Sequence, residues 1–147
     1  MAAIDFHDLA GRPLGPALAQ LLEPLVGAGE RAVVLVGSPE RLDTLNAALW
    51  TYRPDSFLPH GSAAEGFPEQ QPVWLTTEDE NPNGATVLVF LDEVEPAGFD
   101  GFARALFVFD RTSPDGREAA RDRWRQYRDA GHTLRYWEST DEGWRSR

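Results

Sequence analysis

An arginine-rich segment near the end of the sequence offers the clearest binding chemistry. It reads REAARDRWRQYRDAGH over residues 117–132, and five arginines fall within its first twelve residues. The guanidinium group of arginine binds a carboxylate through two parallel hydrogen bonds. Trp124 lies among these arginines, so an apolar group can be buried beside the charge. This combination suits an acidic peptide that ends in an apolar side chain.

Helical periodicity divides this segment into faces. At about 100° per residue, four of the arginines fall within an arc of about 80°, and Trp124 borders that arc. These arginines are Arg117, Arg121, Arg125 and Arg128. The acidic stripe beside them consists of Glu118, Asp122 and Asp129, and the apolar face of Ala119, Ala120, Tyr127 and Ala130. Arg123 projects toward the apolar face, where only snorkelling of its long side chain would account for it.

Two interpretations of the arginine stripe remain open. Arginines and acids on neighbouring stripes can pair on a solvated face, and each such pair contributes about 0.3–0.5 kcal/mol. Alternatively, the stripe binds an external anion. Like charges along one arc repel each other without a bound anion, and the bordering tryptophan offers apolar contact, which favours the second interpretation.

Composition limits the class of protein. The 147 residues are expected to form a single domain over 1–147, and 41% hydrophobic content supports a packed core. The absence of cysteine excludes disulfides, thiol catalysis and zinc-thiolate sites. The net charge of −10 disfavours duplex DNA, and it also opposes the alternative of direct single-strand binding through arginines and aromatics. Residues 111–147 nevertheless carry nine arginines against seven acids, which allows one short anionic partner.

The pattern of elements predicts how the arginine segment is positioned. Strands are expected at 4–9, 31–37, 72–77, 85–92 and 103–110, with helices over 12–29, 38–52 and the arginine segment. Alternation over 132–139 indicates an edge strand, and residues 138–147 are expected to be a loose tail apart from Trp144. Strands that alternate with helices predict a three-layer, Rossmann-like α/β domain with a mainly parallel sheet.

An enzyme is the alternative class, and the motifs give it little support. The turn VGSPERL lacks the glycines of a dinucleotide site, and no phosphate-binding loop is present. His60 lies in the long loop 53–71 near Ser62 and Glu65, but HGSAAEG is not a nucleophile elbow. A histidine that pins the loop is the preferred interpretation. A nucleotide-dependent or hydrolytic enzyme using this loop is kept as the alternative function.

No metal, cofactor or membrane anchor is predicted. The histidines His7, His60 and His132 lack partners at metal-ligand spacing, and TTEDENPNG lacks the order of a calcium loop. MAAIDFHDLAGRPLG does not resemble a secretory signal, and no apolar run approaches the roughly 18 residues of a membrane span. We therefore expect a cytoplasmic protein with no membrane association.

Two strings resemble a known family. They are LLEPLVGAGERAVVLVGSPERLDTLNAALWTYRPDSFLPHG and AARDRWRQYRDAGHTLRYW, with PVWLTT and GATVLVFLD between them in the expected order. With these residues the sequence resembles the chi subunit of bacterial DNA polymerase III, a member of the clamp-loader assembly. The likeness covers nearly the whole chain.

The resemblance implies a Rossmann-like fold without catalytic activity, in an accessory subunit of the polymerase. It implies that the chain grips the acidic C-terminal tail of single-stranded-DNA-binding protein, whose last residue is a phenylalanine, and that it pairs with the small psi subunit. The family's tail site falls on Arg117, Arg121, Trp124 and Arg125, where a known member has lysine at the first and last and tyrosine at the third. Arg128 is added to this predicted site because the helical projection places it on the same arc. No motif assigns residues to the psi contact.

Overall fold

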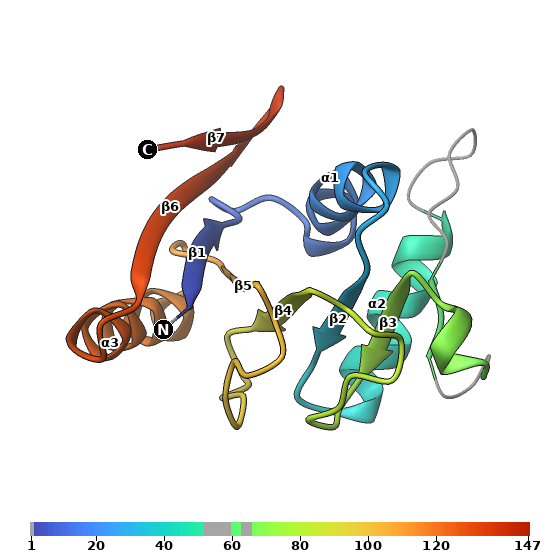
Figure 1. Cartoon of the computed structure of the whole chain (residues 1–147). Helices are drawn as coiled ribbons and strands as arrows, with labels where there is room; N and C mark the ends of the chain where they lie inside the picture. Colours follow the sequence, from blue (N-terminus) through green and yellow to red (C-terminus); the bar gives the residue numbers. More distant parts are fainter. Residues whose placement is uncertain (1, 52–59, 63–65) are drawn as a thin grey trace.

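The computed structural model describes residues 2–51, 60–62 and 66–147, which fold around one β-sheet (Figure 1). Seven strands within these residues pair in the order β3-β2-β4-β5-β1-β6-β7. All neighbours are parallel except β6 and β7. The strands are β1 (Ala3–Asp8), β2 (Ala32–Leu35), β3 (Val73–Thr76), β4 (Val87–Leu91), β5 (Arg104–Phe109), β6 (Thr133–Thr140) and β7 (Gly143–Ser146). The predicted mainly parallel α/β fold is confirmed.

Helices cover both faces of this sheet. They are α1 (Leu14–Gly27), α2 (Pro39–Thr51) and α3 (Pro114–Asp129), with a short 3-10 turn η1 (Pro68–Gln70) before β3. Figure 1 shows α3 with β6 and β7 at one side of the molecule, and α2 with β3 at the other. No helix in the described ranges is long and apolar enough to cross a membrane.

Two apolar clusters form the core, one between each face of the sheet and the helices that cover it. Apolar side chains of α1 and α2, Leu22 and Leu49 among them, pack with Val34 and Val89 of the sheet. On the opposite face, Ala120 and Tyr127 of α3 pack with a second cluster. The aromatic members of that cluster in the sheet are Phe6, Phe90, Phe107 and Phe109. Strands β2, β4 and β5 are buried on both faces, which explains their continuous apolar runs.

The β6–β7 hairpin replaces the expected loose tail. Residues 138–147 form the end of β6 and the antiparallel strand β7, so β6 lies between β1 and β7 and is not an edge strand. Gly143 adopts a φ of +108° at the turn, where the missing Cβ avoids strain. The Trp144 indole donates a hydrogen bond of 3.0 Å to the Ala17 carbonyl of α1. This contact anchors the hairpin to the body of the domain.

The predicted loop over 53–71 lies partly outside the described residues, which omit 52–59 and 63–65. Among those described, His60 is buried, with Nε2 3.4 Å from the Asn46 carbonyl oxygen of α2. The Gly61 amide donates to the Val73 carbonyl of β3. These contacts fix this part of the loop to α2 and the sheet edge, in agreement with a histidine that pins the loop.

Candidate functional site

The first turn of α3 places the arginine segment against the carboxyl end of β5. Ser113 caps the helix through a hydrogen bond of 3.4 Å from the Gly116 amide, and Pro114 occupies the first helical position. A Cβ at Gly116 would collide with the Asp110 carbonyl oxygen. Glycine at this position therefore permits the close approach of α3 to the sheet.

A cavity of about 640 Å³ opens between α3 and the neighbouring strands β1, β5 and β6. Its lining comes from α3, these strands and the end of the β6–β7 hairpin. The lining residues are Phe6, Phe109, Arg111, Arg117, Ala120, Arg121, Trp124, Tyr136 and Arg147. The site therefore combines aromatic walls with four arginines.

The structure brings three of the five predicted site residues to this cavity. Arg117, Arg121 and Trp124 line it. Arg125 instead lines a depression on the solvent side of α3, which Arg117 and Arg121 also border. Arg128 is exposed and lies 3.4 Å from Asp129, the next residue in the chain. The arginine stripe is thus continuous, but only its first two members and the tryptophan surround the cavity.

Aromatic contacts build the walls. The Trp124 ring packs edge-to-face on Phe6, with a centroid separation of 5.0 Å, and lies 6.5 Å from the Tyr136 ring. Phe109 packs edge-to-face against Phe6 at 6.1 Å and Tyr136 at 6.0 Å. This packing holds each ring in place, so the apolar surface is formed before any ligand arrives.

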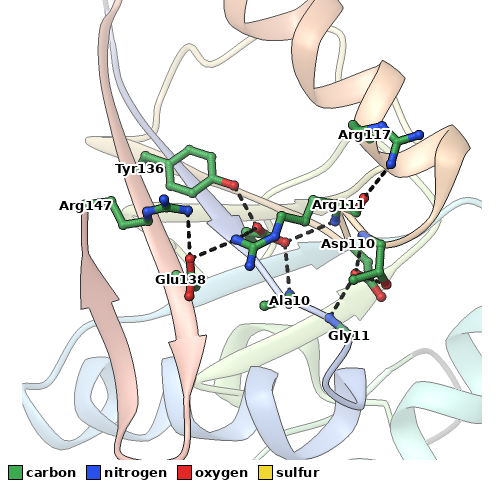
Figure 2. Close-up of polar contacts among 10 residues, drawn as sticks. Ala10, Gly11, Asp110, Arg111, Arg117, Tyr136, Glu138 and Arg147 are labelled. Carbon is green, nitrogen blue, oxygen red and sulfur yellow. Dashed lines mark hydrogen bonds and ion pairs between the residues drawn. The ribbon is translucent and has the colours of Figure 1, made fainter.

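A buried carboxylate fixes Arg111, which Figure 2 shows near Tyr136 and Glu138. Asp8 has no solvent exposure and accepts hydrogen bonds from the Arg111 guanidinium at 2.9 Å and the Tyr136 hydroxyl at 2.7 Å. Its other oxygen accepts from the backbone amides of Ala10 and Arg111. Arg111 also donates to Glu138 at 2.8 Å, and Arg147 donates to the same Glu138 oxygen at 2.8 Å.

The pKa shifts in this network follow from these contacts. Burial, with the hydrogen bond to Asp8, raises the pKa of Tyr136 to about 12, so the hydroxyl stays a donor. The hydrogen bond from Arg111 lowers the pKa of Glu138, with further help from Arg147. The same Glu138 contact raises the pKa of Arg111. Arg111 and Glu138 are therefore both ionised at neutral pH, while Tyr136 is neutral.

Two of the lining arginines lack such compensation. Arg117 donates to the neutral carbonyl oxygen of Arg111 at 3.3 Å. Within residues 2–51, 60–62 and 66–147, no carboxylate lies within ion-pair distance of Arg117 or Arg121. Two uncompensated guanidinium groups beside an aromatic cavity favour a ligand that carries a carboxylate next to an apolar group.

Arg123 belongs to the core and not to the site. Its guanidinium lies over the Phe107 ring, 4.8 Å from the centroid, and 3.2 Å from Glu95. Its side chain is only 12% exposed. The helical projection placed Arg123 toward the sheet correctly, and the contact with an aromatic ring explains how a charged residue is tolerated there.

Sequence reasoning missed the lining residues outside α3. Arg111 lies two residues after the buried strand β5. The carboxyl ends of parallel strands are where α/β folds place ligands, so this position could have indicated Arg111 as a site residue. The alternation of β1 places Phe6 and Asp8 on one face. Nothing in the sequence pattern indicates Arg147. In the part of the chain that the structure describes, no group of three or more His, Cys, Asp or Glu could hold a metal ion.

Comparison with known proteins identifies the family of this chain. A model of the family described as "DNA polymerase III chi subunit, HolC" matches residues 1–135. The DNA polymerase III subunit chi of Pseudomonas aeruginosa is 34% identical over 138 residues, which cover 91% of this chain and 94% of that protein. A probable DNA polymerase III subunit chi of Rickettsia prowazekii is 34% identical over 95 residues, covering 65% of this chain and 58% of that protein.

Fold and site together define a single-sheet α/β protein with an aromatic, arginine-lined surface cavity. The chain belongs to the DNA polymerase III chi subunit family, as the sequence resemblance predicted. It is therefore an accessory subunit in DNA replication.

Proposed function

We propose that this subunit links the polymerase III clamp loader to single-stranded-DNA-binding protein by binding the acidic C-terminal tail of that protein. The observation that carries the proposal is the pair of uncompensated arginines, Arg117 and Arg121, beside the aromatic cavity. In this proposal the subunit acts by binding in the cytoplasm and has no active site of its own. Where a psi subunit exists, it connects the chain to the clamp loader.

The terminal phenylalanine of the tail enters the cavity beside Trp124, and its carboxylate meets Arg121. Upstream acidic residues of the tail then lie along Arg117, Arg125 and Arg128. A hydrogen bond to a charged group contributes about 1.5–3 kcal/mol, and burial of the phenylalanine ring a further 1.5–3 kcal/mol or so. After the cost of ordering the peptide, these terms fit a micromolar-class contact.

Titration of a fluorescently labelled tail peptide against the wild-type chain and Arg121→Ala tests the proposal. Arg145→Ala is the matched control, because Arg145 is exposed and lies outside the lining of the cavity. We expect Arg121→Ala to weaken binding about tenfold while the control binds as wild type, and added salt to weaken all affinities. Equal affinity of Arg121→Ala and wild type would refute the site.

Two further arms separate the parts of the proposal. A peptide without its terminal phenylalanine should bind far more weakly, and equal binding would refute the role of the cavity. A gel shift with free single-stranded DNA should show little binding at physiological salt, because the chain carries a net charge of −10. Strong binding there would favour direct contact with DNA.

A further inference from the structure

The β6–β7 hairpin supplies the wall of the cavity that faces α3. Figure 2 shows Arg147 and Arg117 on opposite sides of Arg111. We propose that Arg147 is a second carboxylate-binding residue of the peptide site, held ready by Glu138 until an acidic ligand enters. This inference rests on the proposed function and extends it, since Tyr136, Glu138 and Arg147 lie beyond the residues 1–135 that the family model matches.

The backbone holds Arg147 at the cavity. Its amide donates a hydrogen bond of 2.9 Å to the Tyr136 carbonyl of β6. Its guanidinium lies 5.6 Å from the centroid of the Tyr136 ring, which favours a nearby cation. The side chain is 55% exposed, so its guanidinium can reach a ligand without unfolding the hairpin.

Arg147 can leave Glu138 at low electrostatic cost, because Glu138 stays paired with Arg111. One Glu138 oxygen accepts from both Arg111 and Arg147, at 2.8 Å each. Arg111 is also bound to the buried Asp8, so it stays in place and keeps Glu138 paired if Arg147 turns away. Arg147 can therefore exchange the Glu138 carboxylate for a ligand carboxylate, whereas Arg111 cannot.

The charges around the cavity favour an acidic ligand. Four arginines line it, and the carboxylates bound to them within the described residues are those of Asp8 and Glu138. Four arginines against two carboxylates leave an excess of basic groups around the cavity. Because Arg147 and α3 lie on different walls, a peptide with carboxylates on both sides of its apolar side chain is held from two directions. Arg147 thereby selects for more than one acidic residue in the tail.

The first test compares tail-peptide affinity in Arg147→Ala, Arg147→Lys and the control Arg145→Ala. Arg145 lies on β7, two residues before Arg147, and carries the same charge, but it does not line the cavity. We expect Arg147→Ala to weaken binding about fivefold, Arg147→Lys less, and Arg145→Ala hardly at all. Equal affinities of Arg147→Ala and Arg145→Ala would overturn the inference. Urea unfolding of each variant verifies that the hairpin remains folded.

The second test uses the competition between Glu138 and the ligand. Glu138→Gln should tighten peptide binding by about twofold or more, because Arg147 then binds the ligand without first breaking an ion pair with Glu138. Glu142→Gln, exposed in the turn of the hairpin, controls for the change in net charge. If Arg147 only braced the hairpin, Glu138→Gln would weaken binding, and that result would overturn the inference.

These outcomes also separate the inference from the proposed function. Weaker binding by Arg121→Ala combined with wild-type affinity of Arg147→Ala overturns the role of Arg147 alone. No effect of Arg121→Ala, or no binding of the tail to the wild-type chain, overturns both.

Discussion

The Arg111 guanidinium lies 2.9 Å from the Asp8 carboxylate, which is fully buried at the carboxyl end of β1. Arg111 follows β5, and Tyr136 on β6 binds the same carboxylate oxygen. Since β1 lies between β5 and β6, one carboxylate joins three neighbouring strands. The interaction fixes the strand ends from which the cavity walls project.

The first prediction concerns this carboxylate. Asp8→Ala should lower the free energy of unfolding by about 2–4 kcal/mol, because it leaves the Tyr136 hydroxyl without its partner and leaves Arg111 with Glu138 as its remaining ion pair. Urea unfolding measures the loss. The control is Asp141→Ala, which removes an exposed pair with Arg12 and should cost less than about 1 kcal/mol. Equal losses in the two variants would show that the Asp8 network does not stabilise the fold.

How far the sequence predicts this site depends on the range of the contacts. Helical periodicity correctly places Arg117, Arg121 and Trp124 near one another, because these residues lie within two turns of one helix. Arg111 and Arg147 approach them only through the order of strands in the sheet. A period of two tells which residues share a face of a strand, but not which strand lies beside it.

The hairpin illustrates the same limit. The alternation of LRYWES correctly indicates a strand, yet β6 pairs with β1 on one side and β7 on the other. The chain segment of β7 is short and mostly polar, so its own sequence does not predict a strand. Its position depends on pairing with β6 and on the anchoring of Trp144 to α1.

The second prediction concerns pH. Burial lowers the pKa of His7 from 6.5 to about 4, although Asp5 opposes the shift. Between these values the unfolded chain binds a proton that the folded chain does not, so stability falls as the pH falls from about 6.5 to 4, by about 3 kcal/mol in total. His7→Phe preserves a ring beside Trp137 and Trp144 and removes this titration.

Urea unfolding at several pH values tests this effect. The difference in stability between wild type and His7→Phe should change across the window and be constant above it. The comparison with the variant is needed because burial raises the pKa of Asp92 to about 6, so the contribution of Asp92 to folding stability falls as the pH rises. A difference independent of pH would refute the titration of His7.

The third prediction separates stability from binding along α3. Arg123→Met should destabilise the fold by about 1 kcal/mol, because it removes the contact of the guanidinium with Phe107 and Glu95. Tail affinity should not change. The same substitution at Arg121, which is exposed, should leave stability unchanged and weaken the peptide complex. Thermal unfolding and peptide titration of both variants measure the two effects, and a reversed pattern would contradict the assignment of Arg123 to the core.

The fourth prediction concerns the approach of α3 to the sheet. Replacing a helical glycine with alanine normally stabilises a protein by up to about 1 kcal/mol. Gly27→Ala in α1 should show this gain, since a Cβ there meets nothing within 4 Å. At Gly116 the added methyl group would collide with the Asp110 carbonyl oxygen and lie 3.2 Å from the Asp92 carboxylate. Gly116→Ala should therefore destabilise the fold by about 1–3 kcal/mol.

The same substitution should also affect the site. Arg117 follows Gly116 directly, so a shift of the first turn of α3 away from β5 moves Arg117 relative to the aromatic walls. We expect Gly116→Ala to weaken tail binding and Gly27→Ala to leave it unchanged, as measured by peptide titration well below each unfolding temperature. If Gly116→Ala instead stabilised the fold as Gly27→Ala does, the close contact between α3 and Asp110 would not be what positions α3 beside the cavity.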